Sequence, residues 1–240
     1  MKKILFTALL FIASLPMFAQ LNMQIHHDFG KTIMGDELSN RARLTATIEN
    51  FKADKWGSTY FFVDADFGSN TMKSVYAEFS REFKFWEAPF AVHIEYNGGL
   101  KDETGSFDDA YLAGAAWNWA NKDFSKTFSL QLLYKYLANQ PSSNKHSWQV
   151  TTVWGIHFAK GLCTFSGYAD VSHDNSVSGN LVFSSEPQFW FNLAALDSVD
   201  DDFKLSLGGE LELSKNLVWP AEGVNDKFYA IPTLAAKWTF

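Results

Sequence analysis

The sequence predicts a single closed, antiparallel transmembrane β-barrel of about twelve strands, and three observations support that fold class. Segments of roughly ten residues alternate between apolar and polar side chains, which is the period and length of a tilted, membrane-crossing strand. Long and short connectors alternate along the chain. Aromatic residues gather at strand ends, as in the interfacial girdles of barrels. The alternative is a soluble barrel or sandwich, which would turn its apolar side chains inward.

Composition agrees with this fold class. Apolar residues make up 47% of the chain and 23 residues are Phe, yet no internal apolar run is long enough for a membrane helix. The net charge of -7 argues against nucleic acid as a partner. The single cysteine, Cys163, excludes an intrachain disulfide, and its outward parity marks it as a small hydrophobe.

Residues 1–19 have the anatomy of a secretory signal peptide. Lys2 and Lys3 precede an apolar stretch, and Pro16 and Ala19 stand before Gln20. A retained membrane anchor is the alternative, but an apolar core of about a dozen residues is too short to span a bilayer comfortably. We therefore expect the barrel to occupy residues 20–240.

The hairpin from Trp56 to Trp86 sets the pattern for the other strands. Its first arm places Ser58, Tyr60, Phe62, Asp64 and Asp66 on one face and apolar residues on the other. Its second arm alternates Tyr76, Glu78, Ser80, Glu82 and Lys84 with Val75, Ala77, Phe79, Phe83 and Phe85. The same alternation predicts strands at 21–30, 41–51, 56–68, 72–86, 89–98, 110–120, 126–138, 147–158, 162–173, 180–193, 203–214 and 228–240.

Connector lengths predict the sidedness of the barrel. Long polar connectors at 31–40, 99–109, 139–145 and 215–226 follow odd strands, whereas short ones at 52–55, 87–88, 121–125 and 159–160 follow even strands. Long extracellular loops and short periplasmic turns put both termini in the periplasm. The short connector at 68–70 and the acidic turn at 197–202 are exceptions.

At the opening hairpin the chain resembles the Tsx-like family of nucleoside-specific outer-membrane channels, including its branch known as a domain of unknown function. The resemblance rests on TYFFVDADFG at 59–68, then Tyr76, Glu78 and Arg81, and on AAKWTF at the C-terminus. It implies passive diffusion of nucleosides. Arg81 has outward parity, so either a bulge resets the register or Arg81 lies at the lipid headgroups. The terminal Phe240 resembles the signature that barrel-assembly machinery recognises.

Inward parity selects the candidate lumen residues. Aromatic rings can stack on a nucleobase, and carboxylates can accept hydrogen bonds from ribose hydroxyls. The candidate lumen-lining residues are Tyr60, Phe62, Asp64, Asp66, Tyr76, Glu78, Glu95, Tyr168, Glu186, Trp190 and Glu210. Arg43, Lys135, Lys204 and Lys237 are expected to compensate the acids.

Three alternatives stay open. The lumen of a narrow barrel can be filled by salt-bridged side chains with no transport, or it can form a non-specific small pore. A lipid hydrolase would use His173, Asn175 and Ser176, but Ser176 lies in a polar loop without an orienting group. The histidines lack metal-ligand spacing, and no cofactor is expected. We therefore expect a non-enzymatic outer-membrane channel with lipid and a small solute, nucleosides first, as its partners.

Overall fold

The computed structural model describes residues 19–68, 71–102, 105–218 and 220–240. The predicted signal peptide at 1–19 lies outside the described residues except for Ala19, which opens β1. The strands are β1 (Ala19–Asp28), β2 (Leu44–Asp54), β3 (Gly57–Phe67), β4 (Met72–Phe83), β5 (Phe90–Lys101), β6 (Gly105–Ser106), β7 (Ala110–Ala120), β8 (Lys126–Leu137), β9 (His146–Phe158), β10 (Cys163–His173), β11 (Leu181–Ser185), β12 (Gln188–Asn192), β13 (Leu205–Lys215) and β14 (Phe228–Thr239).

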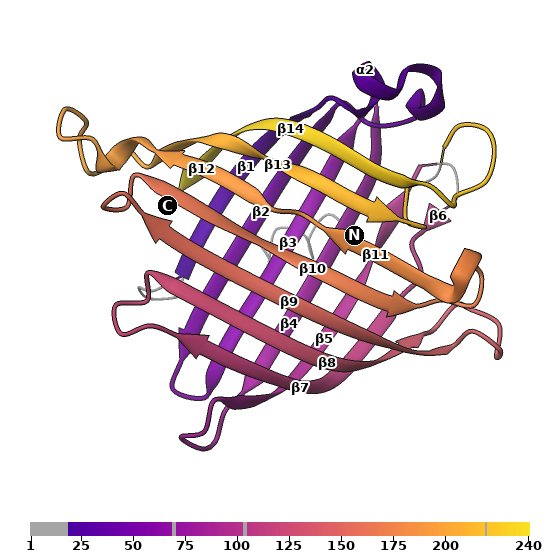
Figure 1. Ribbon diagram of the computed structural model, residues 1–240, viewed down its shortest axis with the longest axis horizontal. Helices are drawn as coiled ribbons and strands as arrows, with labels where there is room; N and C mark the ends of the chain where they lie inside the picture. The colour runs from indigo at the N-terminus through magenta and orange to yellow at the C-terminus, as the bar shows by residue number, and fades with distance from the viewer. Residues whose placement is uncertain (1–18, 69–70, 103–104, 219) are drawn as a thin grey trace, which may run out of the picture.

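The sheet closes on itself. Sequential strands pair antiparallel, and β14 pairs back with β1 (Figure 1). The two-residue β6 pairs only with β5, and β11 and β12 lie end to end between β10 and β13. With β11 and β12 counted as one and β6 set aside, twelve of the described strands form the barrel wall. The predicted closed antiparallel barrel of twelve strands is confirmed.

The two faces of the wall have the polarity of a membrane barrel. On β1 the outward Ile25 is 52% exposed, whereas the inward Gln24 is only 2% exposed. Leu132 and Leu234 stand on the same outer surface. A soluble barrel would bury these apolar side chains and expose the polar ones, so the soluble alternative is excluded by the arrangement.

The connector at 29–43 is more ordered than the sequence suggests. It contains α2 (Gly30–Met34) and the 3-10 turn η1 (Gly35–Leu38), and α2 lies over β14 at one end of the barrel (Figure 1). Leu38 packs against Val218, Tyr229 and Ile231, which anchors the connector to β14. The other short helical turns are η2 (Ser178–Asn180) and η3 (Leu193–Ala195). Within the described part of the chain, no helix is long and apolar enough to cross a membrane.

The strand predicted at 180–193 is broken in the structure. β11 ends at Ser185 and β12 begins at Gln188, because Pro187 has no N–H to donate to the ladder. On β10, Gly167 faces the break with a φ of 152°, and a Cβ there would collide with the carbonyl oxygen of Glu186. The carbonyl of Pro187 still accepts a hydrogen bond from the Leu211 N–H at 3.0 Å. The register is therefore the same on both sides of the break.

The barrel has two distinct ends. At the end that holds both described termini, here the terminus end, the connectors are 55–56, 84–89, 121–125, 159–162 and 193–204. At the opposite end, the loop end, the longest connectors are 29–43 and 216–227. The shorter connectors mostly lie at the terminus end, as predicted. The exceptions are the long connector 193–204 at that end and the short connector between β3 and β4 at the loop end.

Candidate functional site

Asp64 and Asp66 project into the lumen from β3 and are held there by hydroxyl groups. Thr47 donates to Asp64 at 2.5 Å, and Thr45 donates to Asp66 at 2.6 Å. From the other side, Ser74 donates to Asp66 at 2.7 Å. No ion pair to either carboxylate is present among the described residues. The hydroxyls therefore fix the positions of both carboxyl groups.

A row of aromatic rings follows the same wall of the lumen. The ring centroids of Tyr60 and Phe62 are 6.2 Å apart, and those of Phe62 and Tyr76 are 6.0 Å apart. Tyr76 contacts the ring of Phe107 at 5.2 Å, near the loop end. At the terminus end, Phe51 of β2 pairs in register with Tyr60 and so shares its inward face. The row therefore runs along most of the lumen.

Two further acids lie beside the aromatic row. Glu49 of β2 and Glu78 of β4 are the register partners of Phe62 and share its inward face. Tyr76 donates a hydrogen bond to Glu78 at 2.7 Å. These inward side chains are half-buried rather than fully packed. The lumen is therefore lined by acidic side chains beside β3 and β4.

On the side of the lumen formed by β1, β12 and β14, closely packed side chains fill the interior. Trp190 is 0% exposed, and its indole N–H donates to Gln188 at 3.0 Å. The Lys237 ammonium lies 4.1 Å from the ring centroid of Trp190, and His26 meets the ring edge-on. Trp190 belongs to the sequence-predicted lumen set, but in this arrangement it fills the interior and offers no face to a solute.

Two histidines contact inward acids of the lumen. His26 lies 3.2 Å from Glu210, which is one of the predicted lumen residues. His93 lies 3.0 Å from Glu95 and 3.6 Å from Glu82. The contact of His26 with Glu210 joins strands that are distant in the sequence and leaves no trace in the local alternation, whereas His93 and Glu95 lie two residues apart on β5.

Arg41 makes the densest ionic contact of the loop end. Its side chain donates to Asp28 at 2.8 Å and also to Glu212. Burial acts to lower the pKa of the Arg41 guanidinium, but the charges of Glu212 and Asp28 together raise the pKa above its ordinary value. Arg41 therefore ties the connector at 29–43 to two inward carboxylates, on β1 and β13.

The four bases expected to compensate the acids divide into two groups. Lys135 is inward and donates to Gln149 at 2.9 Å, and Lys237 is inward over Trp190. Arg43 precedes β2 at the loop end and Lys204 precedes β13 at the terminus end, and both side chains are exposed. The two exposed bases stand at the rims because β2 begins at Leu44 and β13 at Leu205, three and two residues after the predicted strand starts at 41 and 203.

The remaining predicted lumen residues lie on the inner face. Tyr168 contacts the Ser184 hydroxyl at 3.1 Å, and Glu186 sits at the break between β11 and β12. Arg81 faces outward in an unbroken register with Thr59, and pairs with Asp54 at 2.7 Å near the terminus end. No bulge reaches this part of β4, so Arg81 lies at the level expected of headgroups.

The residues of the hydrolase alternative do not assemble into a catalytic group. Ser176 donates to Asp174 at 2.6 Å, and Asn175 donates to the Ser143 carbonyl at 3.1 Å. His173 instead stacks on Trp148. Within the described residues, no group of three or more His, Cys, Asp or Glu side chains is arranged to hold a metal ion.

The closed sheet, its apolar outer belt and its polar interior define a transmembrane β-barrel of the porin-like class. By sequence, the chain belongs to the family described as a domain of unknown function, DUF5020, whose model matches residues 19–240. No curated protein matches the chain.

Two solved structures are similar to the fold. A structure described as a NanC porin is 11% identical, with a TM-score of 0.56, and the match covers 92% of this chain and 100% of that one. OccK11 (OpdR) of Pseudomonas aeruginosa is 7% identical, with a TM-score of 0.41, over 91% of this chain and 63% of that one. The likeness to the NanC porin shows a shared fold.

Proposed function

We propose that this barrel is an outer-membrane channel for passive diffusion of small hydrophilic solutes, with a preference for cations and for uncharged solutes that combine a flat ring with hydroxyl groups. Nucleosides are the leading candidates. The observation that carries the proposal is the wall of β3 and β4. There, no described residue forms an ion pair with Asp64 or Asp66, and both lie beside the row of Tyr60, Phe62 and Tyr76.

The chemistry of that wall suits such solutes. Each ring that stacks on a nucleobase contributes about 1–3 kcal/mol, and carboxylates accept hydrogen bonds from ribose hydroxyls. Carboxylates without a paired cation attract positive charge and repel anions, most strongly where a narrow lumen limits screening by water. A non-specific pore would not need rings and acids along one wall.

The orientation proposed for the barrel follows from its two ends. Both described termini lie at the end with mostly shorter connectors, which we assign to the periplasm. On this assignment α2 and η1 are extracellular. The exposed ring of Phe240 on the outer face is available to the barrel-assembly machinery.

Planar-bilayer conductance of the purified barrel tests the proposal. We expect ion current that falls when adenosine or uridine is added, and much smaller effects of ribose or glycine at the same concentration. Equal block by all four solutes would establish a non-specific pore. Absence of current from a correctly folded, heat-modifiable barrel would establish a structural barrel, and phospholipid hydrolysis would then be assayed.

A further inference from the structure

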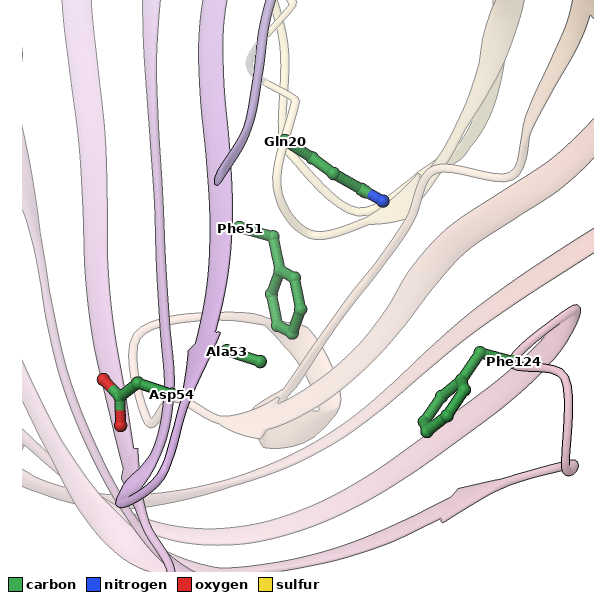
Figure 2. A pocket seen from close by; sticks show the side chains of 5 residues that line it. All are labelled: Gln20, Phe51, Ala53, Asp54 and Phe124. Carbon is green, nitrogen blue, oxygen red and sulfur yellow. The ribbon is translucent and has the colours of Figure 1, made fainter. Parts of the chain in front are cut away.

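A cavity opens into the lumen at the terminus end of the barrel. Its volume is about 520 Å³, within the usual range for small-molecule sites, and Gln20, Phe51, Ala53, Asp54 and Phe124 line it. Figure 2 shows Gln20 and Phe51 pointing into this space from two neighbouring strands, with Phe124 reaching toward it from the far side. The Asp54 side chain lies on the other side of β2, where it pairs with Arg81.

Both aromatic rings of this cavity are open to solvent. Phe51 is 42% exposed and Phe124 is 71% exposed, although neither stands on the membrane-facing surface. Apolar rings on an inner, water-filled surface gain nothing from lipid. Exposed aromatic faces in such a place are the kind that bind a flat ring by stacking.

The turn that carries Phe124 is built to hold the ring in place. Phe124 has a φ of 56°, a backbone conformation that residues with a side chain rarely adopt. Asn121 accepts the Lys126 N–H at 2.9 Å and donates to the Ser125 hydroxyl at 2.9 Å. That hydroxyl donates to Asp123 at 2.9 Å. These hydrogen bonds hold the turn in a backbone conformation in which the Phe124 ring points toward the cavity.

The cavity also continues the aromatic row of the lumen. Phe51 is the register partner of Tyr60, so the Phe51 ring extends the row of the β3 wall, and Phe124 lies across the cavity from it. Gln20 supplies an amide that can donate to and accept from the edge of a heterocycle.

We propose that Phe51 and Phe124 form a stacking subsite for a flat heterocyclic ring at the terminus end of the lumen. The subsite would hold a ring-bearing solute as it enters or leaves the barrel. The role of the subsite in transport rests on the proposed channel function. The binding of a heterocyclic ring at the subsite is independent of that function.

Equilibrium dialysis of the detergent-solubilised full barrel with labelled adenosine tests the subsite, with ribose as the ring-free probe. We expect Phe124→Ala and Phe51→Ala each to weaken adenosine binding about 5- to 100-fold, the equivalent of one lost stacking contact. The matched control is Phe90→Ala, which removes an exposed ring from the membrane-facing side of β5 near the same end. Phe124→Leu keeps the apolar bulk and should lose as much affinity as Phe124→Ala.

The outcomes separate the subsite from the channel. Two results would overturn the subsite, even where adenosine still blocks current. One is that Phe51→Ala and Phe124→Ala both bind adenosine with wild-type affinity, and the other is that the wild-type barrel does not bind adenosine. Weakened binding in these variants, with an unchanged Phe90→Ala barrel, supports the subsite even where no current flows and the channel proposal has failed. Heat-modifiable gel mobility verifies that each variant is folded.

Discussion

Replacement of Arg41 by Gln should destabilise the barrel by about 2–3 kcal/mol. At 2.8 Å from Asp28, the guanidinium gains about 6 kcal/mol of gross attraction at an effective dielectric constant near 20, and desolvation offsets much of it. Removing one partner of a buried ion pair typically costs about 3–5 kcal/mol. The Arg41 side chain is 23% exposed, so water partly screens the two acids and we take a value below that range.

The assay is equilibrium unfolding in urea of the barrel in lipid vesicles, followed by tryptophan fluorescence. The matched control is the triple variant Arg41→Gln, Asp28→Asn, Glu212→Gln, which removes the acids together with the base and should recover most of the loss. An Arg41→Gln barrel within about 0.5 kcal/mol of wild type would refute the reasoning. So would a triple variant as unstable as the single one, because unpaired charge would then not be the cause.

Two further predictions concern the wall and the loop end. Gly114→Ala should destabilise the barrel by about 1–3 kcal/mol in the same unfolding assay, because the added Cβ would collide with the Leu132 carbonyl. The control Gly155→Ala should lose less stability, because its Cβ meets only a threonine hydroxyl. Equal losses in the two variants would contradict this prediction. Hydrogen bonding by Lys227 lowers the pKa of Glu37 below its ordinary 4.5, so the contact persists at neutral pH and is lost as pH falls through that lowered pKa. The amide-exchange protection factors of residues 30–38, which are corrected for the intrinsic pH dependence of exchange, should therefore fall from pH 7 to pH 3 in wild type, and a Glu37→Gln barrel that shows the same fall would contradict this.

Much of the wall could be predicted from the sequence, because the alternation of side chains is a local property of each strand. The outward Ile25 and the inward Gln24 follow from it directly. Pro187 itself indicates a break in the strand, but the alternation of apolar and polar side chains continues across it and predicts one continuous strand at 180–193.

The features that join distant parts of the chain could not be predicted in this way. Arg41 contacts Glu212 from a polar connector whose sequence has no apolar–polar periodicity, so no sequence pattern predicts the ion pair. Phe51 shares the parity of Glu49 and ends the predicted second strand at 41–51, so the alternation was enough to find it. Phe124 could not, because its orientation depends on the hydrogen bonds of a single turn.

The charge selectivity of the lumen tests the central claim most directly. The measurement is the reversal potential of the barrel in a planar bilayer under a KCl gradient, for wild type and for Asp64→Asn with Asp66→Asn. The matched control, Asp200→Asn with Asp202→Asn, removes two exposed acids from the connector at 193–204. We expect wild type and the control to prefer cations and the lumen variant to lose that preference while remaining a folded barrel. An unchanged reversal potential in the lumen variant would contradict the claim that these carboxylates line the path of the solute.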